Sequence, residues 1–174
     1  MGLLTLLLAF VFFAGVAMTI NEGLWNNTIA VFIILIAALI AIPWGYIAGL
    51  AIIDAVQPSA ENAWAFTFAA VWGVFALSAI IMRTIADKSS RVRLRFIPQL
   101  DKFGGILIGL VVATMYTSFV AATLWYWPIS AGVWKIADAS DFQKTAIMRA
   151  TAPIHTAVTK FHGREMADIV QQKN

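Results

Sequence analysis

Four long apolar runs alternate with short polar segments along this 174-residue chain. They cover residues 1–20, 28–53, 63–82 and 104–127, and none of them contains Asp, Glu, Lys, Arg or His. A helix needs about 20 apolar residues to cross the roughly 30 Å of hydrocarbon in a bilayer. The pattern therefore predicts an all-α integral membrane protein whose four transmembrane helices form one domain over residues 1–127.

The remaining residues, 128–174, predict a short amphipathic helical C-terminal tail. Ser140 followed by Gln143 resembles a capping box at a helix start. Apolar residues then recur at helical spacing at Ile147, Ala150, Ile154, Val158 and Phe161. Because proline has no backbone N–H, Pro153 is expected to divide the tail into two helices. Such a pair fits the outer membrane surface or a partner protein.

Composition supports the membrane assignment, since 61% of the residues are hydrophobic and 12% are charged. The Lys and Arg residues are unevenly placed: six lie from Arg83 to Lys102 and six from Lys135 to Lys173. Short basic connections next to spans stay on the cytoplasmic side. The denser cluster predicts a cytoplasmic connection at Arg91, Arg93 and Arg95, here called the basic loop, with both termini outside a bacterial inner membrane.

Small residues recur every four positions in two of the predicted spans. The fourth span carries Gly105, Gly109, Ala113, Thr117 and Ala121, and the second carries Ala37, Ala41, Gly45 and Gly49. Small residues let helix backbones approach closely where burial in lipid gives no hydrophobic driving force. We expect Gly45 and Gly49 to pack against Gly105 and Gly109, within one chain or between copies, with Ala113 continuing the fourth-span ladder. The alternative is that the ladders are background, because Gly and Ala are common in spans.

Pro43, near the middle of the second span, predicts a kink close to Leu39. The kink is either structural or part of a broken helix that lines a transport path. Hydroxyls in the fourth span allow the same two interpretations, because Ser and Thr line pores but also bond their own i−4 carbonyls. They are Thr114, Tyr116, Thr117, Ser118 and Thr123. The spans carry no ionisable group of the kind that transport paths use, which favours the structural interpretation of both features.

Aromatic residues mark the ends of several spans. They are Trp25, Trp64, Trp125, Tyr126 and Trp127. Their positions predict anchors at the membrane–water interface, where amphipathic rings are enriched.

Candidate chemistry is sparse. His155, His162 and Glu165 lie at helical spacing, but a metal site needs more ligands and a diagnostic pattern, so solvated positions are the favoured interpretation. The chain lacks cysteine, the GxSxG elbow, the P-loop and the dinucleotide glycine fingerprint. We expect no catalytic, cofactor or metal site, no enzyme activity and no nucleic-acid partner.

Two segments carry a family resemblance. One runs from the basic loop through Pro98 to Asp101-Lys102-Phe103-Gly104-Gly105 and Gly109, and the other is Glu22-Gly23-Leu24-Trp25. Together they resemble the colicin V production protein family, in the form found in planctomycete-like members. The resemblance covers about residues 1–128. It implies a four-span bacterial inner-membrane protein linked to colicin V production or export and to envelope homeostasis, and it brings no catalytic residue.

These observations favour a non-enzymatic scaffold or accessory factor, with a channel or transporter subunit as the alternative. The expected partners are the lipid bilayer, anionic lipids included, and a membrane protein or a second copy of the chain. Arg91, Arg93 and Arg95 alternate with apolar residues, which gives an extended segment one basic edge. With Lys88, this edge is expected to dock on anionic lipid or an acidic partner, because each basic residue near an anionic membrane contributes about 1 kcal/mol.

Overall fold

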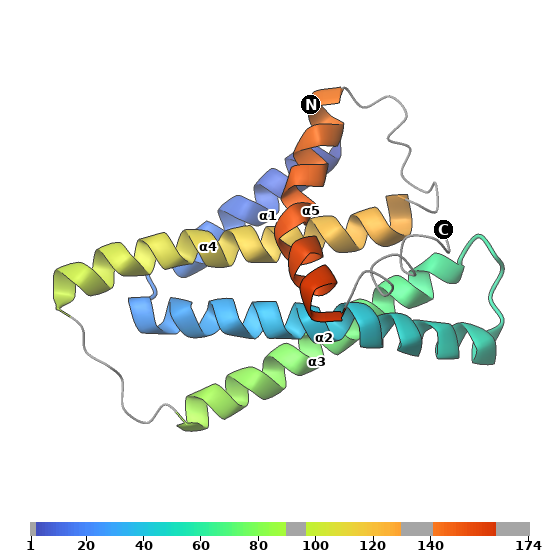
Figure 1. Ribbon diagram of the computed structural model, residues 1–174, viewed down its shortest axis with the longest axis horizontal. Helices are drawn as coiled ribbons and strands as arrows, with labels where there is room; N and C mark the ends of the chain where they lie inside the picture. Colours follow the sequence, from blue (N-terminus) through green and yellow to red (C-terminus); the bar gives the residue numbers. More distant parts are fainter. Residues whose placement is uncertain (1–2, 90–96, 130–140, 163–174) are drawn as a thin grey trace.

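The computed structural model describes residues 3–89, 97–129 and 141–162, and within these ranges the chain is entirely helical apart from its connections. The helices are α1 (Leu3–Thr19), α2 (Leu24–Val56), α3 (Ala63–Ser89), α4 (Pro98–Leu124) and α5 (Asp141–His162). A π-helical turn, η1 (Trp125–Ile129), extends α4. Figure 1 shows α2 and α4 lying side by side, with α1 and α3 on either side of them and α5 running across both. The all-α prediction is confirmed.

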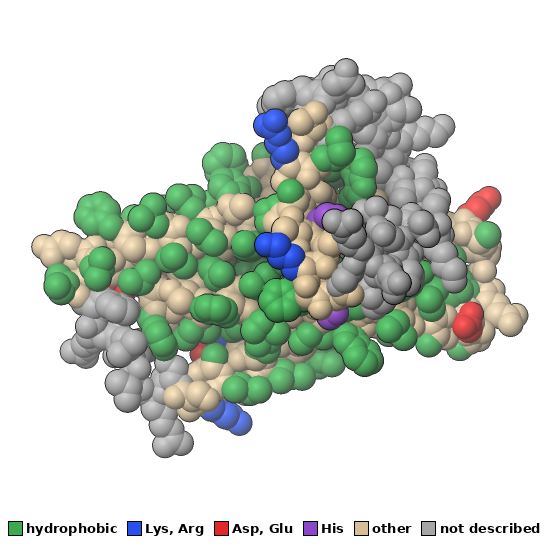
Figure 2. All heavy atoms as spheres, viewed as in Figure 1, with side chains coloured by type: hydrophobic (Ala, Val, Ile, Leu, Met, Phe, Trp, Pro, Cys, Tyr) green, Lys and Arg blue, Asp and Glu red, His purple; other side chains and the backbone are tan. Residues whose placement is uncertain are grey.

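Three of these helices are long and apolar enough to cross a membrane. They are α2, α3, and α4 together with η1, and this indicates a multi-pass membrane protein. The first helix, α1, is equally apolar but has only 17 residues, which corresponds to a length of about 25 Å. Figure 2 shows hydrophobic side chains covering the exposed sides of the long helices.

The bundle is ordered α1–α4–α2–α3 in space, so the two central helices are not neighbours in the sequence. Helix α3 packs antiparallel to α2, because Gly45 faces Val71 while Gly49 faces Thr67. Helix α2 ends at Gln57, whose left-handed backbone (φ 48°) allows its N–H to bond the carbonyl of Ile53.

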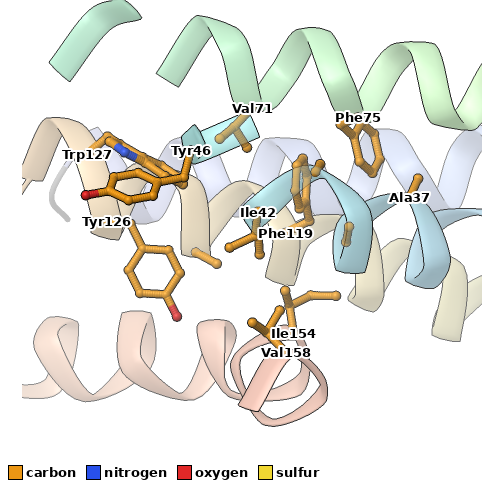
Figure 3. Packing of buried hydrophobic residues seen from close by; sticks show 13 residues of the cluster. Ala37, Ile42, Tyr46, Val71, Phe75, Phe119, Tyr126, Trp127, Ile154 and Val158 are labelled. Carbon is orange, nitrogen blue, oxygen red and sulfur yellow. The ribbon is translucent and has the colours of Figure 1, made fainter. Parts of the chain in front are cut away.

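The core lies where α2, α3 and α4 meet. Phe75 of α3 stacks on Phe119 of α4 with ring centroids 4.1 Å apart, and Ile42 of α2 lies beside them (Figure 3). Tyr126 and Trp127 are 5% and 2% exposed, so they belong to this core. The prediction that these two residues anchor the protein at the membrane surface is therefore wrong.

Helix α5 packs on the bundle through one apolar face. Ile147, Ile154 and Val158 are at most 3% exposed, and the last two share the core with α2 and α4 (Figure 3). The helix continues from Asp141 to His162 with Pro153 inside it, so the predicted break at Pro153 is wrong. The predicted domain boundary at residues 127–128 falls within η1, and α5 joins the core of the helices that precede it.

Candidate functional site

A buried amide connects three helices at one end of the bundle. Asn27, near the start of α2, is 1% exposed. Its Nδ2 donates to the carbonyl oxygens of Thr19 (3.0 Å), Gly105 (2.8 Å) and, more weakly, Glu22 (3.4 Å). Thr19 also donates its hydroxyl to the carbonyl of Gly109 at 3.3 Å. These contacts join the end of α1, the start of α2 and the first turns of α4.

The start of α2 is capped from a distant part of the chain. The residue before the helix is Gly23, which has no side chain to cap the first free N–H groups. Oδ1 of Asp101, in the first turn of α4, accepts the N–H of Leu24 at 2.9 Å. A carboxylate at a helix N-terminus is also favoured by the helix dipole. We call this group, formed by Thr19, Glu22–Leu24, Asn27, Asp101 and Gly105, the loop-end junction.

The glycine ladders both make close contacts, but with partners that the sequence did not identify. A Cβ atom on Gly45 or Gly49 would lie 2.5 or 2.6 Å from a backbone Cα of α3. A Cβ on Gly105 would lie 2.7 Å from the carbonyl oxygen of Glu22, and one on Gly109 would lie 2.9 Å from Oγ1 of Thr19. The predicted pairing of the two ladders with each other is therefore wrong.

Ala113, the next member of the fourth-span ladder, is fully buried. It faces Gly15 of α1, whose added Cβ would lie 3.1 Å from the Cβ of Ala113. The small residues of α4 thus allow close approach of α1 and of the connection between α1 and α2.

A second polar junction lies where α5 crosses the bundle. Pro43 has no N–H to donate to the carbonyl of Leu39, four residues earlier in α2. That carbonyl accepts a hydrogen bond from Nε2 of His162 at 2.9 Å. In lipid, a carbonyl freed by proline has to find such a partner on a neighbouring helix. Helix α2 accordingly continues through Pro43 without a break.

Pro153 is accommodated in a similar way. The hydroxyl of Ser118, on α4, accepts the N–H of Ile154 at 3.2 Å and lies 3.4 Å from the carbonyl of Thr151. The α4 side chain thus supplies a partner to the α5 backbone on both sides of the proline. Two residues after Pro153, His155 Nδ1 forms a 2.6 Å hydrogen bond with the hydroxyl of Tyr126. We call these contacts the α5 crossing.

The features that favoured a transport path therefore have structural partners. Thr114 and Thr117 donate to the carbonyls four residues earlier, at 2.8 and 2.7 Å, as the structural interpretation predicted. Thr123 bonds the carbonyl three residues earlier. Only Ser118, among these Ser and Thr residues of α4, bonds another helix.

The two histidines do not converge. His155 bonds Tyr126 and is partly buried, so the prediction that it is a solvated position is wrong. His162 bonds the α2 backbone but is exposed, as predicted. Glu165 lies outside the described residues. Across the described ranges, no group of three or more His, Cys, Asp or Glu residues is placed to hold a metal ion.

The basic loop is largely outside the described residues, which exclude Arg91, Arg93 and Arg95. Lys88 is described and lies exposed in the last turn of α3. Its place at that helix end brings it near the connection to α4, as the sequence requires. Docking of this loop on lipid stays a prediction.

Two buried polar atoms lack a partner within the described residues. They are the hydroxyl of Tyr46 on α2 and Nε1 of Trp72 on α3. Both side chains lie in or against the core cluster, where an unpaired donor costs stability. Neither residue could be recognised as unpaired from the sequence, because a residue type does not reveal its spatial neighbours.

Neither a family model, nor a curated protein, nor a solved structure matches this chain.

Proposed function

We propose that this chain is a four-span bacterial inner-membrane protein of the colicin V production type, acting as a non-enzymatic scaffold or accessory factor in toxin production, export or envelope homeostasis. The observation that carries the proposal is the loop-end junction. The two segments on which the family resemblance rests meet there, although Leu24 and Asp101 are 77 residues apart.

The residue types of both segments have a physical role in this junction. Asp101 supplies the carboxylate that caps α2, and Gly105 leaves room for the carbonyl of Glu22 at its side. Gly23 is equally constrained, because an added Cβ would lie 2.9 Å from Oδ2 of Asp101. A membrane protein that joins α2 to α4 through these residues would need both segments of the family resemblance.

In this proposal α1 is the first of four spans. Its length of about 25 Å is near the lower limit for crossing the hydrocarbon layer, and it packs along α4. The basic loop and the loop-end junction face the cytoplasm, and both termini lie outside.

The scaffold role rests on the outward face of α3. Leu77, Ile80 and Ile85 are 60%, 64% and 58% exposed, and an added Cβ on Gly73 would meet no atom within 4 Å. This face contacts lipid and is open to a helix of a membrane partner or of a second copy. It is larger than the exposed faces of α2 and α4, since only 17% of the most apolar stretch of α3 is buried.

A photo-reactive residue at Leu77 tests this role in intact cells. A discrete protein crosslink is expected at Leu77 and none at Phe75, which is 7% exposed on the opposite side of α3. Crosslinks to lipid alone at Leu77 and at Ile80 would contradict a scaffold that binds through α3.

A further inference from the structure

A groove of about 360 Å³ lies where α1, α4 and α5 meet. Its lining includes Leu8, Phe12, Thr117, Ser118, Ile147 and Arg149. This volume is at the lower end of the range of about 300–1,000 Å³ for small-molecule sites. The lining also includes Phe13, which is 68% exposed, so the groove is open to the surroundings along α1.

The groove combines an apolar wall with one unpaired cation. The hydroxyls in the lining are already used, since Thr117 donates to the carbonyl of Ala113 and Ser118 accepts the N–H of Ile154. Arg149 is exposed and forms no ion pair or hydrogen bond with another residue of the described ranges. A guanidinium offers five donors in a fork that matches a phosphate, so Arg149 is suited to bind an anionic headgroup.

The depth of the groove fits the level of lipid headgroups. Thr5, in its lining, lies 14 residues before Thr19, which is about 21 Å along α1. Ser118 lies 17 residues after Asp101, which is about 26 Å along α4. Because the hydrocarbon layer is about 30 Å thick, a groove at this distance from the loop-end junction lies near the opposite membrane boundary.

The geometry points to a binding site for one anionic phospholipid, whose phosphate pairs with Arg149 and whose acyl chain lies against Leu8 and Phe12. The acyl chain enters the groove from its exposed side, at Phe13. Figure 2 shows basic side chains along α5 next to hydrophobic ones of the neighbouring helices, which is the combination that a phospholipid requires. A zwitterionic phospholipid carries the same phosphate, but its own headgroup cation offsets the attraction to Arg149, so net charge favours the anionic lipid.

Native mass spectrometry of the full chain in mild detergent tests the headgroup contact. Dioleoyl phosphatidylglycerol and dioleoyl phosphatidylcholine are added separately at equal concentration. Arg149→Gln should weaken phosphatidylglycerol binding about fivefold, since one basic residue near an anionic lipid contributes about 1 kcal/mol. Arg149→Lys should retain most of the binding. Lys160→Gln is the matched control, because Lys160 is also exposed on α5 but does not line the groove.

Any contribution of the basic loop to lipid binding is the same in all variants, so the comparison between variants removes it. Equal losses in Arg149→Gln and Lys160→Gln would reduce the effect to general attraction and overturn the site. Equal retention of the two lipids by the unmodified chain would overturn the headgroup assignment.

A second variant tests the acyl-chain contact. Ala9 lines the groove on α1, so Ala9→Trp should fill it and lower phosphatidylglycerol binding, whereas Ala17→Trp, exposed on α1 outside the lining, should not. Unchanged lipid binding in Ala9→Trp would overturn the site. If Ala9→Trp abolished a dimer of the protein and left the lipid adducts unchanged, the groove would bind a second copy. That result would also overturn the lipid site.

Discussion

At the scale of single residues, the buried amide of Asn27 links three parts of the bundle. Its amide donates to three carbonyls that belong to three different segments. Two of these carbonyls, of Thr19 and Glu22, lie at the end of α1 and in the connection that follows it, and that of Thr19 also accepts the N–H of Glu22 at 3.0 Å. The third, of Gly105, belongs to α4. Removing the amide therefore removes three hydrogen bonds that link the start of α2 to these segments.

Asn27→Ala should lower the free energy of unfolding by about 1–3 kcal/mol, because it removes two good hydrogen bonds and one weaker one, each worth about 0.5–1.5 kcal/mol. Thermal unfolding in mild detergent measures it. Asn26→Ala is the matched control, because Asn26 donates to Glu22 at the exposed surface and its loss should cost less than about 0.5 kcal/mol. Equal losses in the two variants would contradict the role of the buried amide.

Two tyrosines with opposite hydrogen-bonding states give a second test. The hydroxyl of Tyr46 is buried without a partner among the described residues, whereas that of Tyr126 bonds His155. Tyr46→Phe should raise the free energy of unfolding by about 1 kcal/mol, and Tyr126→Phe should lower it by a similar amount. A shift of the same sign in both variants would show that the hydroxyl of Tyr46 has a partner after all.

At the scale of helices, the glycine ladders separate the faces that pack from those that do not. An added Cβ on Gly45 meets the backbone of α3, which cannot move as a flexible side chain can. Gly73 on α3 has open space around the same position. The two residues are both inside helices, so they differ in surroundings and not in backbone demands.

Gly45→Ala should destabilise the protein by about 1–3 kcal/mol through overpacking. Gly73→Ala should leave stability unchanged or raise it by about 0.5–1 kcal/mol, because alanine favours a helix. Unfolding temperatures of the two variants in the same detergent provide the comparison. A stable Gly45→Ala protein would mean that α2 and α3 separate more easily than their contacts indicate.

The proline in α2 and the histidine at the end of α5 should act as a unit. Pro43→Ala restores an N–H for the carbonyl of Leu39, so the hydrogen bond from His162 becomes redundant. His162→Ala should therefore cost about 0.5–1.5 kcal/mol in the natural sequence and less than half of that in the Pro43→Ala background. Hydrogen exchange along α5 and the unfolding temperature, measured for the two single variants and the double variant, both give the coupling between Pro43 and His162. Equal costs in the two backgrounds would rule out the coupling.

How far the sequence predicts these elements depends on whether the cause is local. The long apolar runs predict α2, α3 and α4, because the preference of apolar residues for hydrocarbon is a property of each segment by itself. The small-residue ladders correctly mark close contacts, but spacing alone does not say which helix lies opposite. Gly45 therefore faces α3, where the ladders alone predict the fourth span. The continuity of α5 at Pro153 depends on Ser118, more than thirty residues away, and no local pattern contains it.

At the scale of the whole molecule, the arrangement places the connections on two opposite ends. The loop-end junction and the exposed end of α3 at Ser89 share one end, and the turn between α2 and α3, with Ser59, is at the other. The proposed orientation, with the basic loop in the cytoplasm, predicts that these two ends face different compartments.

Single cysteines at Ser59 and Ser89, both exposed, test this orientation in a chain that has no natural cysteine. An impermeant thiol reagent should label Ser59→Cys on intact cells and Ser89→Cys only after the membrane is opened. The reverse pattern would invert the proposed orientation.

The hydrogen bond between Leu39 and His162 also orders events during synthesis. Its two residues are 123 positions apart, so a ribosome adding about 5–20 residues per second needs roughly 6–25 s to make the donor after the acceptor. Throughout that interval the second helix holds a carbonyl in the membrane that its own backbone does not satisfy. The last described helix therefore supplies the partner that the second helix lacks, and a nascent chain released before residue 162 has no His162 to bond the carbonyl of Leu39.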